Sequence, residues 1–374
     1  MHIRNNVITL LLVLFIAGCS KYDKETIKVG RILPLTGPAA SYGQSEQKGT
    51  ALALDEINTK GGIDNKKLEI IFEDDKCDVK EGVNAMKKLV EVDKVPAVLG
   101  ATCSGVTLAI SPIANEKQVL LLSPLSSLAE ITNAGPFVFR VMPSDAFQSR
   151  ILAEWVYSEG YTKIAMLSIN NAWGKGVSDE FQKYYSQLGG VITITEMCKE
   201  GDRDFRIQLG KIKESKPTAI FCPSMPKEGG LILKQLKELG IKVPIYGADA
   251  WSVKELLDEA GNAAEGVMYT YPAQFTGAEY QEFATSFKKK YSQDPDVNAA
   301  GAYDALKILS VCIKNVLDQK LPLTGGNLKI EMSKIKDFKG ATGTTTFDEN
   351  GDSIAKTFEK MIIRNGSRVK YEKQ

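Results

Sequence analysis

Residues Ala97–Ser127 read AVLGATCSGVTLAISPIANEKQVLLLSPLSS. Two short apolar runs, Pro96–Gly100 and Val119–Leu122, are typical of strands buried in a parallel sheet. Each run ends in a turn rich in hydroxyl groups, Thr102–Ser104 after the first and Ser123–Ser127 after the second. The stretch therefore predicts a strand, a turn, a helix, a second strand and a second turn.

The two turns are the first candidates for a binding site. Ligands of open α/β sheets bind at the carboxyl ends of the strands, where backbone N–H groups and helix N-termini attract an anion. Two such turns on successive strands would hold a carboxylate group. Serine is also a preferred N-cap residue, so ordinary helix capping is an equally good interpretation of the same residues.

Length and composition narrow the function further. A chain of 374 residues is long enough for two domains, and a net charge of +1 gives no reason to expect nucleic acid as a partner. The only histidine is His2, which excludes histidine-based catalysis and histidine-ligated zinc from the rest of the chain. Nucleotide-binding glycine motifs are absent. We expect no cofactor and no metal.

The first residues have the pattern of an export signal. Arg4 precedes the apolar run Val7–Ile16, which is too short to span a membrane. Ile16-Ala17-Gly18-Cys19 resembles the cleavage box of bacterial lipoproteins, in which the cysteine carries the lipid. We expect residues 1–18 to be a signal peptide, Cys19 to be the lipid anchor at the membrane, and residues 19–25 to be a tether. A plain secretory signal is the alternative.

The other cysteines fit an exported protein, in which disulfides form. Cys77 follows the expected strand Leu68–Glu73, and Cys103 lies in the first hydroxyl-rich turn. A bond between them would stabilise the protein by ~3 kcal/mol. Cys198 and Cys222 are a second possible pair. Cys312 is expected to be a small buried apolar side chain.

Strand and helix patterns alternate along the whole chain, in two βαβ series of which the second begins after Pro143. This alternation predicts doubly wound parallel sheets. Asn365-Gly366 predicts a hairpin near the end of the chain. Lys227 and Glu228 are expected on a solvated face.

Several short pieces of sequence, in this order, carry a family likeness: Leu33-Pro34-Leu35-Thr36-Gly37-Pro38, Tyr42-Gly43, Leu54-Asp55-Glu56-Ile57-Asn58, Gly61-Gly62-Ile63, Cys103-Ser104, Ser123-Pro124, Gly247-Ala248-Asp249, Tyr303-Asp304-Ala305 and Phe347-Asp348-Glu349-Asn350-Gly351-Asp352. Together they resemble the branched-chain amino acid binding proteins of bacterial ABC transporters, over nearly all of residues 26–374.

This resemblance implies a periplasmic binding protein of type I, an α/β fold with two doubly wound parallel-sheet lobes, a cleft between them and three crossovers. The first lobe would comprise residues 26–142 plus 272–344, and the second residues 143–271 plus 345–374. The crossovers would lie near Arg140–Pro143, Tyr269–Pro272 and Gly343–Phe347. Some members also share the Cys77–Cys103 disulfide.

The resemblance also implies a ligand site. Ser104, the backbone around Ser126 and the hydroxyl group of Ser127 would hold the α-carboxylate of an amino acid, while Asp249 would pair with its ammonium group. Asp249 could instead cap a helix. Two aromatic residues, Tyr42 and Trp173, would line the cleft, although Trp173 could also belong to the core of a lobe.

The implied function is capture of an amino acid with a branched or other apolar side chain, and its delivery to an ABC permease. The protein would be an exported monomer, in contact with the membrane only through its lipid. A receptor or sensor subunit for amides or aromatic acids is the alternative, because the aromatic residue that the family often has near Met225 is missing here. A hydrolase that uses Ser104 or Ser127 lacks a base, so we expect no enzyme.

Overall fold

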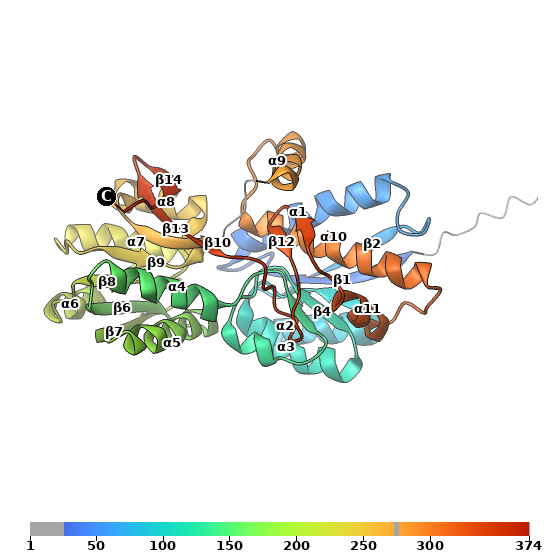
Figure 1. Cartoon of the computed structure of the whole chain (residues 1–374), viewed down its shortest axis with the longest axis horizontal. Helices are drawn as coiled ribbons and strands as arrows, with labels where there is room; N and C mark the ends of the chain where they lie inside the picture. The colour runs from blue at the N-terminus through green and yellow to red at the C-terminus, as the bar shows by residue number, and fades with distance from the viewer. Residues whose placement is uncertain (1–25, 273–276, 374) are drawn as a thin grey trace, which may run out of the picture.

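The computed structural model describes residues 26–272 and 277–373. The expected signal peptide, Cys19 and the tether lie outside these described residues. Within them the chain forms two lobes side by side, which confirms the expected two-lobed α/β architecture (Figure 1).

The first lobe is built on a five-stranded sheet in which all neighbouring strands are parallel. Its strand order is β2-β1-β3-β4-β5. The central strands are apolar and fully buried, as expected for a sheet that is covered by helices on both faces. The strands are β1 (Ile27–Leu33), β2 (Leu68–Asp74), β3 (Ala97–Leu99), β4 (Leu120–Ser123) and β5 (Val138–Arg140).

Six helices and a small hairpin complete this lobe: α1 (Ala40–Thr59), α2 (Val79–Lys87), α3 (Ser104–Lys117), α9 (Ala278–Tyr291), α10 (Val297–Asp318), α11 (Gly325–Met332), and strands β11 (Phe338–Gly340) and β12 (Gly343–Thr345). Helices α1 and α10 pack closely although they are far apart in the sequence (Figure 1). A Cβ atom at Gly49 would lie 2.0 Å from the Ala299 carbonyl oxygen, so this approach requires glycine.

The second lobe has a seven-stranded sheet with the order β14-β13-β10-β9-β8-β6-β7. The strands are β6 (Lys163–Ile169), β7 (Val191–Cys198), β8 (Ala219–Phe221), β9 (Ile245–Gly247), β10 (Met268–Pro272), β13 (Phe358–Arg364) and β14 (Ser367–Lys370). β6 to β10 are parallel, whereas β13 and β14 are antiparallel additions. Asn365 and Gly366 join these two with positive φ angles, which confirms the expected hairpin.

The helices of the second lobe are α4 (Asp145–Ser158), α5 (Ala172–Gln187), α6 (Arg206–Glu214), α7 (Pro226–Glu238) and α8 (Lys254–Ala260), with the 3₁₀ turn η3 (Asp249–Ser252). Glu228, on α7, is buried and accepts a hydrogen bond from the Gly201 N–H at 2.8 Å, so the expected solvated position was wrong for this residue. The backbone N–H needs an acceptor, and the carboxylate supplies it.

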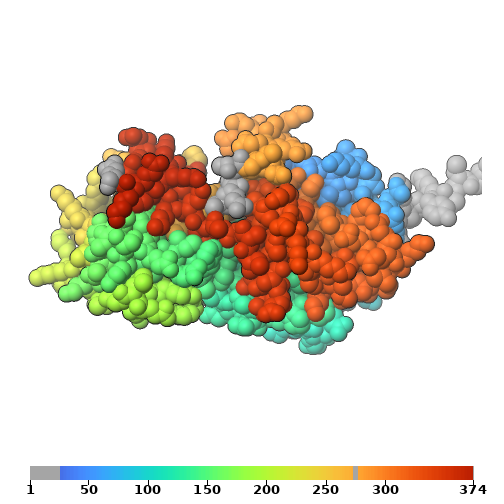
Figure 2. Space-filling view, viewed as in Figure 1, coloured from blue at the N-terminus to red at the C-terminus, as the bar shows by residue number. Residues whose placement is uncertain are grey.

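The chain passes between the lobes after β5, after β10 and before β13. The first and last of these segments are tied together, because Arg140 Nε donates to Asp352 Oδ1 at 2.7 Å and Lys356 Nζ donates to the Val141 carbonyl at 2.8 Å. Phe347 still belongs to the first lobe, where its ring packs edge-on against Phe139. In Figure 2 the red C-terminal segment continues across the junction of the lobes.

Cys77 and Cys103 form a disulfide, as expected, and join the turn after β2 to the start of α3. Cys198 and Cys222 do not pair: both are free and buried. Their thiol groups instead donate weak hydrogen bonds to the Ser168 carbonyl and to Ser224 Oγ, each at 3.6 Å. Cys312 is buried in the core of the first lobe, as expected.

Candidate functional site

A cavity of about 260 Å³ lies between the two lobes. It is lined from the first lobe by Ala39, Tyr42, Cys77, Val79, Thr102, Cys103, Ser104, Gly105, Val106, Leu125, Ser127, Met142, Val297 and Asn298, and from the second by Asn171, Ala172, Trp173, Glu200, Met225, Asp249, Ala250, Ser252 and Val253. Both lobes thus build one site, at the carboxyl ends of the strands of each sheet.

The cavity brings together five of the six residues that the sequence indicated for ligand binding: Tyr42, Ser104, Ser127, Trp173 and Asp249. Ser104 begins α3, Trp173 lies in the first turn of α5, and Asp249 begins η3 directly after β9. The pattern of hydroxyl-rich turns indicated Ser104 and Ser127, whereas the family resemblance indicated Tyr42, Trp173 and Asp249.

Ser126 is the exception, since it is buried and does not line the cavity. Its hydroxyl group hydrogen-bonds with Thr107 Oγ1 at 2.7 Å, and its backbone N–H donates to Ser123 Oγ at 2.9 Å. Both polar groups are therefore used inside the lobe. Ser126 holds the turn in shape and is not placed to contact a ligand.

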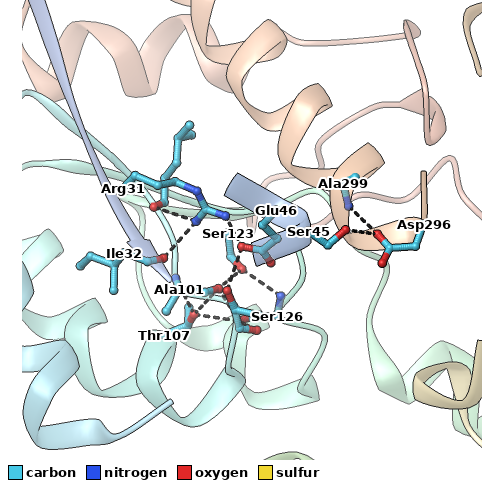
Figure 3. Close-up of polar contacts among 12 residues, drawn as sticks. Arg31, Ile32, Ser45, Glu46, Ala101, Thr107, Ser123, Ser126, Asp296 and Ala299 are labelled. Carbon is cyan, nitrogen blue, oxygen red and sulfur yellow. Dashed lines mark hydrogen bonds and ion pairs between the residues drawn. The ribbon is translucent and has the colours of Figure 1, made fainter. Parts of the chain in front are cut away.

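The turn that carries Ser104 rests on a buried ion pair (Figure 3). Arg31 pairs with Glu46, and Glu46 Oε2 also accepts a hydrogen bond from Thr102 Oγ1 at 2.8 Å. Burial raises the pKa of Glu46 to about 7, although the charge of Arg31 opposes that shift. The sequence analysis missed this pair, because a charged residue inside an apolar strand gives no sign of its partner.

One part of the cavity lining is suited to an anion. The N-termini of α3 and α5 meet there, so that a Cβ atom on Gly105 would lie 3.2 Å from Ala172 Cβ. Within the described part of the chain, the first two N–H groups of α3, those of Ser104 and Gly105, have no acceptor. Ser104 Oγ accepts from the N–H groups of Ser127 and Leu128 at 3.3 and 3.4 Å, which leaves its hydrogen free to donate. A carboxylate would satisfy these donors.

Two other lining residues, Asp249 and Tyr42, are suited to a cation. Oδ1 of Asp249 and the hydroxyl oxygen of Tyr42 are buried and have no hydrogen-bond partner among the described residues. Burial raises the pKa of Asp249 to about 6, and burial together with the charge of Asp249 raises the pKa of Tyr42. Ser127 Oγ donates to Asp145 Oδ2 at 2.9 Å, so its hydrogen is not free for the carboxylate of a ligand, which differs from the role that the resemblance implied for this hydroxyl group.

The charge balance of the cavity follows from its lining. No lysine, arginine or histidine lines it in the described ranges, and Asp249 and Glu200 are its only charged residues. Glu200 is hydrogen-bonded by the Asn171 amide. A ligand with a carboxylate would therefore be held by helix N-termini, while Asp249 would require a positive group on the same ligand.

The remaining wall is apolar and comes from several elements, chiefly Val79, Leu125, Trp173, Met225, Val253 and Val297. Met225 occupies the place where the sequence lacked an aromatic residue. Sequence reasoning missed Val79, Val253 and Val297, because each follows a turn whose local pattern is that of an ordinary helix start.

Two other kinds of site were searched for in residues 26–272 and 277–373. No group of histidine, cysteine or acidic side chains there is arranged to hold a metal ion. In the same residues, no helix has the length and apolar character needed to cross a membrane.

The chain belongs to a family of periplasmic binding proteins, whose sequence model matches residues 26–358. Members of this family bind ligands and are not enzymes, so this chain is a binding protein of the extracytoplasmic space. It is 30% identical to the leucine-, isoleucine-, valine-, threonine- and alanine-binding protein of Pseudomonas aeruginosa, over 90% of both chains.

Two solved structures share the fold over almost the whole chain. A leucine-binding protein from Thermotoga maritima superposes with a TM-score of 0.85 at 28% identity, covering 93% of this chain and 98% of that one. A branched-chain amino acid transporter substrate-binding protein from Streptococcus pneumoniae, in complex with isoleucine, superposes with a TM-score of 0.84 at 31% identity. The match covers 92% of this chain and 98% of that one. These similarities confirm the expected α/β fold of a periplasmic binding protein of type I, with two parallel-sheet lobes.

Proposed function

We propose that this protein captures a branched-chain amino acid in the cavity between its lobes and delivers it to the permease of an ABC transporter. The observation that carries the proposal is that donors for an anion and an acceptor for a cation line the same small cavity. Helix N-termini and Ser104 supply hydrogen-bond donors for an anion, and Asp249 supplies an unpartnered carboxylate oxygen for a cation. An α-amino acid satisfies both with one short molecule.

The side chain of the ligand is inferred from the rest of the wall. Trp173, Met225 and Leu125 would contact it, and they offer no charged group. Burying an aliphatic side chain against such a surface is favourable by ~25 cal/mol per Å² of apolar area. Relatives of similar length that bind leucine, isoleucine and valine support this class of ligand.

We also propose that the protein is a monomer held at the membrane by a lipid on Cys19, after removal of residues 1–18. The sequence Ile16-Ala17-Gly18-Cys19 supports this proposal. Mass spectrometry of the native N-terminus should find a lipidated Cys19. An unmodified chain that begins at another residue would contradict the anchor and leave the binding function untouched.

Calorimetry with matched ligands tests the binding function. We expect leucine, isoleucine or valine to bind tightly, and 4-methylpentanoate, which is leucine without its amino group, to bind at least a hundredfold more weakly. Leucinamide, which lacks the carboxylate, should also bind weakly. Equal binding of leucine and 4-methylpentanoate would contradict the ammonium role of Asp249 and favour a receptor for aromatic or other carboxylic acids.

A further inference from the structure

A second cavity, of about 220 Å³, adjoins the first and has no part in the site described above. Pro38 and Tyr42 line it from the first lobe, and the rest of its lining comes from the second lobe. The second cavity therefore also lies between the lobes. A space of this size beside a binding site can hold part of a ligand.

Two side chains divide the cavities. In the described part of the chain, Tyr42 and Met225 are the residues that line both. Tyr42 lies on α1 of the first lobe, and Met225 directly precedes α7 of the second. Glu200 lines the first cavity and its neighbour Gly201 lines the second. The cavities are thus two compartments of one cleft, with one dividing side chain from each lobe.

The backbone of Met225 is held in place, whereas its side chain only fills space. Its carbonyl accepts a hydrogen bond from the Gly229 N–H at 2.8 Å, and Pro226 follows it at the start of α7. The side chain is half-buried and packs against the core of the second lobe. Methionine is unbranched and fills irregular gaps. Truncation of this side chain would therefore join the two cavities while the backbone keeps its contacts.

The second cavity is more polar than the apolar wall of the first. Within the described residues, the N–H groups of Lys227 and Glu228, at the start of α7, have no acceptor. Three carboxyl groups also line the cavity, those of Asp202, Glu228 and Glu255. Each accepts a hydrogen bond from the described residues through only one of its oxygens. An amide or ureido group, which both donates and accepts hydrogen bonds, would satisfy such a lining.

Glu228 has the most to gain from such a ligand. Its side chain lines the second cavity although the residue is only 5% exposed. A buried carboxylate oxygen without a donor is costly. A ligand that brings an N–H group into the second cavity would supply that donor.

We propose that the second cavity is an extension subsite for the amide or ureido end of a longer amino-acid side chain, and that Met225 is the specificity residue that restricts its use. This inference rests on the proposed function. The apolar stem of such a side chain would lie against Trp173 and Leu125, as the side chain of leucine would. With Met225 in place, the polar end stays at the apolar wall without hydrogen-bond partners, so the protein prefers leucine.

Calorimetry on the whole protein with three amino acids tests this inference. The probes are L-leucine, L-citrulline, whose side chain ends in a ureido group, and L-2-aminooctanoate, whose chain is as long but ends in a methyl group. Met225→Ala should raise the affinity for citrulline relative to leucine by about tenfold, as for one or two new hydrogen bonds, and should favour 2-aminooctanoate less. Ile207→Ala, a similar truncation at an exposed position of α6 outside both cavities, should behave as wild type.

A second substitution locates the effect. Leu231 lines the second cavity and not the first. Adding Leu231→Trp to Met225→Ala should abolish the gain for citrulline, because the indole ring fills the space that the ureido group would occupy. A gain that survives this substitution would refute the extension subsite.

The remaining outcomes separate the two proposals. Tyr42→Ala opens the same partition from the first lobe and decides the question if Met225→Ala fails to fold. If the preference for leucine over citrulline stays that of the wild type in the opened variants, the extension subsite is refuted and the proposed function stands. If 2-aminooctanoate gains as much as citrulline, the polar character of the subsite is refuted. If the wild-type protein binds no amino acid at all, the proposed function itself fails.

Discussion

At the scale of single residues, Asp249 shows how binding and stability oppose each other. Its carboxylate is buried without a full set of partners, which destabilises the ligand-free protein and prepares the site for a cation. Since its pKa is raised to about 6 from 3.8, the folded protein binds more protons than the unfolded chain between these values. The free energy of unfolding contributed by this group therefore falls as the pH rises through this window and stays low above it.

Asp249→Asn should consequently have opposite effects on binding and stability. Above about pH 7 we expect the ligand-free variant to be more stable than wild type by on the order of 1–3 kcal/mol, and the difference should vanish near pH 4. Leucine affinity should fall by roughly thirtyfold to several thousandfold, as for removal of one partner of a buried charge pair. Thermal melts across the pH range and calorimetry check both effects. Asp258→Asn, in an exposed ion pair on α8, should change neither.

At the scale of elements, the disulfide joins two turns that both line the cavity. Cys77 follows β2 and Cys103 precedes α3, with a sequence separation of 26 and their Cα atoms 5.6 Å apart. The backbone N–H of Cys77 also donates to the buried carboxylate of Asp75, at 2.9 Å. Two contacts thus hold the start of α3, which carries Ser104. One is the disulfide at Cys103, and the other is the hydrogen bond from Thr102 to Glu46, which is paired with Arg31.

The double variant Cys77→Ala/Cys103→Ala should lower the free energy of unfolding by ~3 kcal/mol, because the unfolded chain regains the freedom of a loop of this length. Leucine affinity should fall as well, since the donors at the start of α3 become less ordered. Urea unfolding and calorimetry measure these effects. A reducing agent should weaken the wild-type protein and leave the double variant unchanged. If it leaves both unchanged, the bond does not contribute to stability.

At the scale of the whole molecule, the two lobes meet at the start of two helices. Gly105 on α3 faces Ala172 on α5. A Cβ atom on Gly105 would lie 3.2 Å from Ala172 Cβ, which is closer than most Cβ contacts in proteins. Ser41 Oγ and Glu255 Oε2 join the lobes elsewhere, at 3.2 Å. Binding proteins of two lobes close around their ligands by hinge motion. The absence of a side chain at Gly105 is what permits so close an approach.

Gly105→Leu should therefore hold the lobes apart. We expect leucine affinity to fall at least tenfold, with the thermal stability of the ligand-free protein little changed, because the added side chain points between the lobes and not into a core. Small-angle scattering should show compaction of the wild-type protein on leucine binding and none for the variant. Gly210→Leu, where a Cβ atom on α6 meets nothing within 4 Å, is the control. A variant that compacts like wild type would contradict this account.

The sequence by itself determined the features that depend on local pattern. Alternating strand and helix periods predicted the two sheets, and the turns after β3 and β4 indicated Ser104 and Ser127. The resemblance of short motifs to a known family indicated Trp173 and Asp249, which follow β6 and β9. The cysteine positions predicted the bond between Cys77 and Cys103. These inferences succeed because the end of a parallel strand is both a local signal and the place where such sheets bind ligands.

Only the tertiary structure decided what each polar group does. Ser126 and Ser127 are neighbours of identical chemistry, yet one is used inside the lobe and the other lines the cavity. Ser127 donates to Asp145, which lies at the start of another helix, and Arg31 on β1 pairs with Glu46 on α1. Such roles depend on which buried groups the packing brings within hydrogen-bond or charge contact. Burial and the direction of a hydroxyl hydrogen are properties of the packed molecule and not of any local stretch of sequence.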